Sequence, residues 1–81
     1  MPAYKPAFPI GSSIRIANRA TLERFRLEWR LHHRLQPEQL AHADEIRTVV
    51  NVGHYHGGDV LYTLSDLPDY LWHEQCLIGM G

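Results

Sequence analysis

The sequence predicts a mainly β fold: a small, partly open barrel of four or five antiparallel strands, with one or two short helices inserted after the first strand. Three observations support this class. β-Branched residues are concentrated in residues 46–52, a Gly57-Gly58 pair separates two apolar runs, and a proline-containing turn precedes a third run. Gly-Gly accepts positive φ at both central positions of a tight hairpin. So few short strands cannot form two packed sheets, whereas a bent sheet that closes on itself removes exposed edges.

The first strand is expected over residues 13–17, where polar and apolar residues alternate. Residues 18–31 fit both a helix and a strand. Asn18 or Thr21 can cap a helix, and one face of that helix would carry three large apolar residues, Leu22, Phe25 and Trp29. We favour the helix, because Leu, Glu and Arg are strong helix formers and β-branched residues are absent from residues 22–31.

A helix in this segment has consequences for two leucines. It leaves Leu27 and Leu31 on the face opposite Phe25. These leucines would then contact the N-terminal lead-in or a partner, and self-association through them stays open. A second short helix is expected over residues 36–41, since Pro37 fits the first helical position, where its missing N–H is not needed.

The second half of the chain reads as a β-meander. A long strand, its hairpin partner, a turn and a last strand are expected over residues 46–55, 60–64, 65–69 and 70–78. Three prolines in residues 1–9 predict an extended, poorly ordered lead-in, and residues 10–81 form one barrel domain. The lead-in has no apolar core of the kind found in signal peptides, and we expect no membrane segment.

Charge and cysteine content narrow the class of partner. The formal net charge is −1, which gives no general attraction to nucleic acid. One cysteine, Cys76, excludes an internal disulfide and fits a reducing compartment, so we expect a cytoplasmic protein. Six arginines gather in the first half: Arg15, Arg19, Arg24, Arg26, Arg30 and Arg34. They are typical of a solvated basic helix, and the alternative is a surface for an anionic partner.

Several short motifs occur in one order along the chain. They are Phe8-x-x-Gly11-x-x-Ile14-Arg15-Ile16, His33-Arg34-Leu35-x-Pro37, Val49-Val50-x-Val52, Leu61-Tyr62-Thr63-Leu64 and Leu71-Trp72. This order resembles the C-terminal SH3-like domain of the nitrile hydratase β-subunit. The chain is also similar to small stand-alone bacterial SH3-like proteins of unassigned role.

The resemblance implies an SH3-like barrel that is not itself a catalyst. In nitrile hydratases a cysteine-rich stretch of the other subunit holds the metal, and this sequence has no such stretch. We therefore expect a non-catalytic accessory or protein-interaction module without a cofactor. Its partner would be a protein, for example a metallo-enzyme α-type subunit.

Four residues are candidates for contacting that partner: Arg34, Tyr55, Tyr70 and Trp72. Aromatic side chains on SH3-like barrels can line a shallow groove for extended peptides. The alternative for each aromatic residue is packing in the core or across strands. Arg34 is included because the sequence offers it no evident ion-pair partner.

The alternative function is metal binding by His54, His56, His73 and Cys76. Residues two apart on a strand share a face, which suits His54 and His56, and imidazole and thiolate are ligands for Zn²⁺. The competing interpretation makes Cys76 a small core residue and the histidines rim residues. A Cys-His nucleophilic site is disfavoured, because Cys76 lies in an apolar run.

Overall fold

The computed structural model describes residues 6–54 and 59–80. Its elements in chain order are β1 (Ser13–Ile16), α1 (Arg19–Glu28), the 3₁₀ helix η1 (Pro37–His42), β2 (Ile46–His54), β3 (Val60–Leu64), β4 (Leu67–His73), the 3₁₀ turn η3 (Glu74–Cys76) and β5 (Leu77–Gly79). The strands form one five-stranded antiparallel sheet in the order β4-β3-β2-β1-β5. The predicted mainly β class is confirmed.

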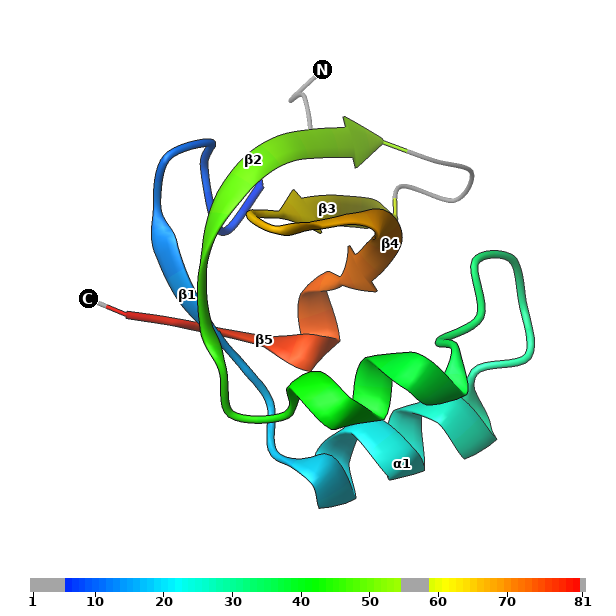
Figure 1. Ribbon diagram of the computed structural model, residues 1–81. Helices are drawn as coiled ribbons and strands as arrows, with labels where there is room; N and C mark the ends of the chain where they lie inside the picture. Colours follow the sequence, from blue (N-terminus) through cyan, green and yellow to red (C-terminus); the bar gives the residue numbers. More distant parts are fainter. Residues whose placement is uncertain (1–5, 55–58, 81) are drawn as a thin grey trace.

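The bend of β2 turns this sheet into a barrel. The first part of β2 pairs with β1, with Ser13 opposite Thr48, and the second part pairs with β3, with His54 opposite Val60. The register shifts between Val49 and Asn51, and such bulges bend a strand and increase its twist. Figure 1 shows β2 arching over the other strands. The turn η3 links β4 to β5, the two edges of the sheet, so the structure is a small, SH3-like, partly open barrel.

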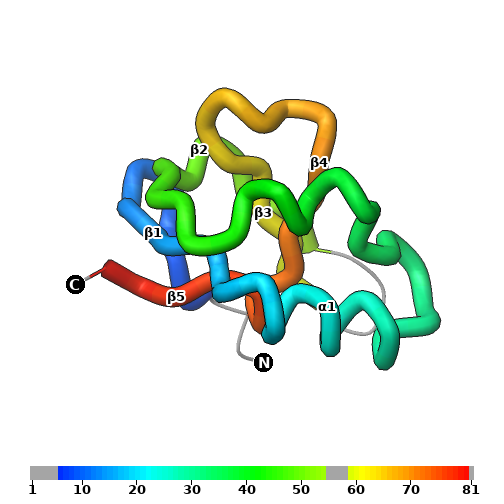
Figure 2. The backbone as a smooth tube through the Cα atoms, turned by 60° about the horizontal axis from the view of Figure 1, so that its bottom comes forward, coloured from blue at the N-terminus to red at the C-terminus, as the bar shows by residue number. Residues whose placement is uncertain are grey.

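Within residues 18–31, whose sequence fits both a helix and a strand, the structure has the helix α1. The Asn18 side chain caps it by accepting a hydrogen bond from the Thr21 N–H at 2.8 Å. Leu22 and Phe25 are buried, and Trp29 ends the helix with its N–H donating to the Phe25 carbonyl. The second predicted helix is η1. Figure 2 shows α1 and η1 lying together at one end of the barrel.

The predicted last strand over residues 70–78 is wrong in its limits. The turn after β3 is tighter than expected, with Asp66 in the left-handed region at φ 63°. β4 begins at Leu67 and includes Pro68, which has no N–H; an edge strand tolerates proline because the N–H groups on its outer side pair with no neighbouring strand. The chain then leaves β4 through η3, and β5 pairs with β1 instead of continuing the hairpin.

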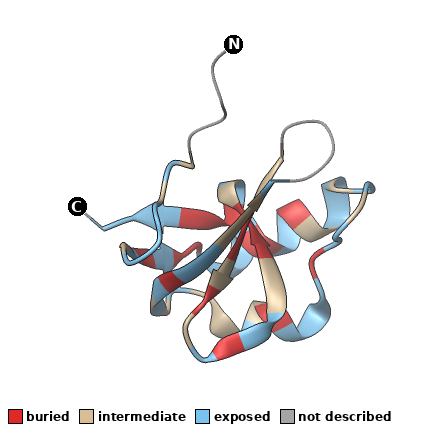
Figure 3. Cartoon of the chain, turned by 90° about the horizontal axis from the view of Figure 1, so that it is seen from above, coloured by how far each residue is buried: buried red, intermediate tan, exposed pale blue. Residues whose placement is uncertain are grey.

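The core fills the barrel and extends under α1. Figure 3 shows buried positions on the strands and on both helical segments. The largest fully buried side chains of the core include Trp72, Tyr62, Ile14, Ile16 and Leu22. The expectation that Trp72 is an exposed contact residue is therefore wrong. Trp72 pairs with Tyr62 across β4 and β3, and both side chains are 0% exposed.

The described part of the lead-in packs against the barrel. The ring centroid of Phe8 lies 5.5 Å from that of Tyr62, and the Phe8 ring lies 3.2 Å from where a Cβ on Gly79 would stand. The Tyr62 hydroxyl donates to Glu74 at 2.6 Å, and burial with this carboxylate raises the pKa of Tyr62 to about 12. Phe8 thus belongs to the packed domain, although the sequence places it in the lead-in. None of the helices in the described ranges is long and apolar enough to cross a membrane.

The contrast between Leu22 and Leu27 tests how α1 is held. Leu22 is fully buried and Leu27 is 68% exposed on the same helix. We expect Leu22→Ala to lower the free energy of unfolding by about 3 kcal/mol, because it leaves a cavity between α1 and the barrel. The matched change Leu27→Ala should stay within about 0.5 kcal/mol of the parent. Urea denaturation measures both, and equal losses would contradict this packing of α1.

Candidate protein-binding cleft

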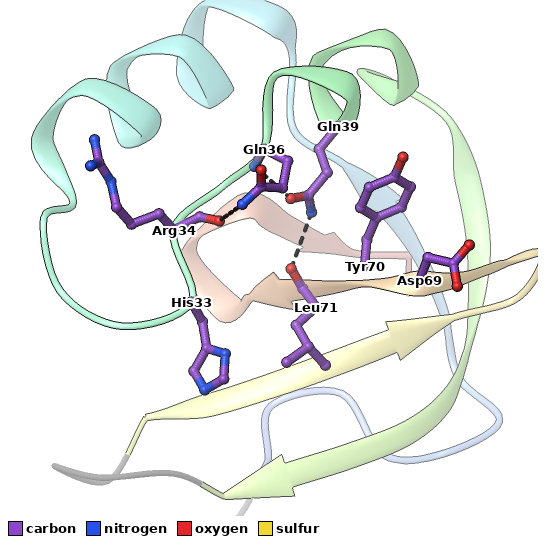
Figure 4. Close-up of a pocket in the computed structure, with 7 residues that line it drawn as sticks. All are labelled: His33, Arg34, Gln36, Gln39, Asp69, Tyr70 and Leu71. Carbon is purple, nitrogen blue, oxygen red and sulfur yellow. Dashed lines mark hydrogen bonds between the residues drawn. The ribbon is translucent and has the colours of Figure 1, made fainter.

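A cleft of about 350 Å³ lies between β4 and the segment that runs from the bend after α1 into η1. Figure 4 shows the residues that line it: His33, Arg34, Gln36, Gln39, Asp69, Tyr70 and Leu71. Two of the four residues predicted to contact a partner, Arg34 and Tyr70, meet here from distant parts of the sequence.

Gln39 is the buried residue among those that line this cleft, and its hydrogen bonds fix the cleft's shape. Its side chain is 2% exposed, and both ends of its amide are hydrogen-bonded. The Gln36 N–H donates to Oε1 at 2.8 Å, which closes a capping box at the start of η1, and Nε2 donates to the Leu71 carbonyl at 3.1 Å. The second bond ties η1 to β4 and occupies a backbone acceptor on the sheet edge. A partner strand therefore meets a covered edge at this point.

The bend before η1 fixes the position of Arg34. His33 adopts φ 54°, in the left-handed region, which reverses the chain after α1. Leu35 is buried in the core, and the Gln36 side chain donates to the Arg34 carbonyl at 3.1 Å. The Arg34 backbone is thus anchored on both sides while its side chain stays exposed at the rim.

The opposite rim carries an aromatic ring and an acid. Tyr70 is half-buried, with its ring centroid 6.4 Å from that of His42 on η1, and the neighbouring Asp69 is exposed. In Figure 4 these two side chains stand across the cleft from Arg34. The cleft therefore offers a cation on one rim and an aromatic face with a carboxylate on the other.

A cluster of aromatic and imidazole rings packs against the bend between α1 and η1 and holds it in place. The Phe25 and Trp29 rings stack on each other with centroids 5.4 Å apart, and the His73 ring packs against both, at centroid distances of 4.8 and 4.7 Å. Its Nε2 donates to the His33 carbonyl at 2.7 Å, and Trp29 Nε1 donates to the His32 carbonyl at 2.7 Å. Burial lowers the pKa of His73 below its ordinary value, and the His33 carbonyl and the charge of Asp59 oppose this effect less strongly. The neutral ring thus fastens the bend to β4.

His32 and Asp59 form the arrangement closest to a catalytic one. His32 Nε2 lies 3.0 Å from a carboxylate oxygen of Asp59, which is how a carboxylate orients an imidazole base. General-base catalysis of acyl transfer also needs a nucleophile within hydrogen-bond reach. In the described ranges, no hydroxyl or thiol bonds to His32, and its buried Nδ1 has no partner. Among the residues that the structure describes, this pair therefore has no nucleophile to activate.

The metal hypothesis gains no support from the members that the structure describes. His54 is exposed at the end of β2, His73 Nε2 is engaged by the His33 carbonyl, and Cys76 is fully buried. Burial raises the pKa of the Cys76 thiol to about 12, which opposes formation of the thiolate that binds metal. Within residues 6–54 and 59–80, no group of three or more potential ligands comes together. His56 and the predicted contact residue Tyr55 lie outside the described residues.

Comparisons with protein families, with curated proteins and with solved structures found no match to this chain. The likeness to the nitrile hydratase β-subunit therefore stays a prediction from the motifs.

The pKa of His73 gives the stability a defined pH dependence. Between the lowered folded pKa and the unfolded value of about 6.5, the unfolded chain binds more protons, so stability falls as the pH drops through this range. We expect the urea midpoint to decrease between about pH 7 and pH 5. His73→Gln keeps an amide donor for the His33 carbonyl but does not titrate, so it should flatten this part of the profile. Parallel profiles for the two proteins would contradict the assignment.

Cys76 should be inert in the folded protein. With a pKa of about 12, roughly one thiol in 10⁴ is ionised at pH 8. We expect 5,5′-dithiobis(2-nitrobenzoate) to label the folded protein at least about 100-fold more slowly than the protein in urea. Absorbance at the product wavelength follows both rates. Fast labelling of the folded protein, with protection by zinc, would instead support the metal hypothesis.

Proposed function

We propose that this protein is a non-catalytic protein-interaction module that binds an extended segment of a partner protein in the cleft between η1 and β4. The single observation that carries the proposal is the juxtaposition of Arg34 and Tyr70 across a cleft of about 350 Å³. The proposal includes a cytoplasmic location, which the single cysteine supports.

The cleft is built before a partner arrives. Hydrogen bonds of Gln39 and His73 hold η1 and the bend before it against β4, and none of these bonds involves the side chain of Arg34 or Tyr70. A preformed site avoids part of the entropy lost on binding, because its walls need no further ordering. Tyrosine and arginine are also the residue types that most often dominate protein interfaces.

The charges of the rim define the chemistry of the partner segment. A carboxylate of the partner can pair with Arg34, and a flat apolar group such as proline can lie on the Tyr70 ring. A basic residue can approach the exposed Asp69. We propose a metallo-enzyme α-type subunit as the first partner to test, because the sequence motifs resemble the nitrile hydratase β-subunit.

Affinity purification with cleft variants tests this proposal. The tagged protein, Arg34→Glu and Tyr70→Ala would be expressed in the native host, and the bound proteins quantified by mass spectrometry. We expect at least one protein to be bound by the parent and to fall about tenfold with each variant, because Tyr70→Ala removes the aromatic contact and Arg34→Glu places a negative charge where the partner's carboxylate would lie.

Ile46→Ala supplies the matched control. Ile46 is 58% exposed on β2 and does not line the cleft, so this variant should retain the same bound protein. Circular dichroism would verify that all variants fold. Equal retention by the parent and both cleft variants, or no protein bound above the level of the tag alone, would overturn the proposal.

A further inference from the structure

A second surface, separate from the cleft, lies on the outer side of α1. Arg24 and Leu27 share the helix face opposite the buried Leu22, and Arg30 and Leu31 follow in the bend after the helix. Leu27 is 68% exposed and Leu31 is 64% exposed. We name these four residues, Arg24, Leu27, Arg30 and Leu31, the Arg-Leu surface.

The described lead-in does not account for these leucines. Its aromatic residue, Phe8, packs on Tyr62 of β3 and Gly79 of β5. Neither leucine joins the hydrophobic core of the described residues. For Leu27 and Leu31, the structure therefore favours contact with a partner over contact with residues 6–9.

The arginines of this surface have no ion-pair partner among the described residues. Arg19, on the same helix, pairs with Glu23 at 3.0 Å, whereas Arg24 and Arg30 make no such contact. Residues 24–34 contain four arginines and one glutamate, a formal charge of +3 in a chain whose net charge is −1. The segment that carries the two exposed leucines thus has a net positive charge, of which Arg34 belongs to the cleft and Arg24 and Arg30 lie near the leucines in the sequence.

We propose that the Arg-Leu surface binds an acidic protein segment that also carries apolar side chains, such as an acidic amphipathic helix. Carboxylates of that segment would pair with Arg24 and Arg30, and its apolar side would cover Leu27 and Leu31. Complementary charge steers such a partner to the surface, and burial of the leucines holds it there. This inference does not depend on the proposed function of the cleft.

Other occupants fit less well. A second copy docking through the same surface would place arginine against arginine, which is repulsive. Insertion into a membrane needs a free apolar face, but the main apolar face of α1 is buried against the barrel. Nucleic acid binds mainly through its phosphates, which gain nothing from contact with two leucines, and the chain as a whole is slightly acidic.

Peptide binding tests the proposal directly. The probe is a fluorescein-labelled helical peptide of glutamate and leucine in an amphipathic pattern, and its control has serine in place of leucine at the same charge. We expect fluorescence anisotropy to show binding of the leucine peptide, weaker by about tenfold with Leu27→Ser/Leu31→Ser and with Arg24→Gln/Arg30→Gln. The arginine variant should also show a smaller dependence of affinity on salt.

Arg19→Gln is the matched control, because its guanidinium is already paired with Glu23, and it should stay within about twofold of the parent. Tyr70→Ala should bind the peptide like the parent, which separates this surface from the cleft. Equal binding of the serine peptide would overturn the proposal in favour of simple charge attraction. Tighter binding of single-stranded RNA or of phosphatidylglycerol vesicles, or no peptide binding, would also overturn it.

Discussion

The bridge that Gln39 makes between η1 and β4 is the constraint on which the cleft depends. A buried amide is stable only when its donor and acceptor are satisfied, and here the Gln36 N–H and the Leu71 carbonyl satisfy them. This pairing sets the spacing between a helical turn and a sheet edge that are distant in the sequence. It also covers part of the edge of β4, so at this point the proposed partner would meet side chains and not a free strand edge.

The local elements could be predicted because their signals are local. Alternation in β1, the Asn18 cap of α1 and Pro37 in η1 each act within a few residues, and the structure has all three. The break at η3 could not be predicted, because it depends on the pairing of β5 with β1. Burial of Trp72 was missed for a similar reason. At the C-terminal end of β4 both faces of the strand are buried. Trp72 lies inside the barrel, and His73, on the opposite face, packs against Phe25 and Trp29 at α1.

The candidate site was predicted only in part. The sequence predicts both Arg34 and Tyr70 as contact residues, but nothing in their local patterns indicates that they line one cleft. Gln39 was missed, although its spacing from Gln36 is that of a capping box, a signal that the sequence does contain. Its bond to Leu71 joins two segments whose proximity only the folded chain creates.

We propose that the cleft contacts a protein through Tyr70. Site-specific photo-crosslinking tests it most directly, with Tyr70→p-benzoylphenylalanine in living host cells and the same change at Ile46, which lies outside the cleft, as the reference. We expect a discrete protein adduct from position 70 that is absent from position 46. No adduct at position 70, or the same adducts from both positions, would contradict it.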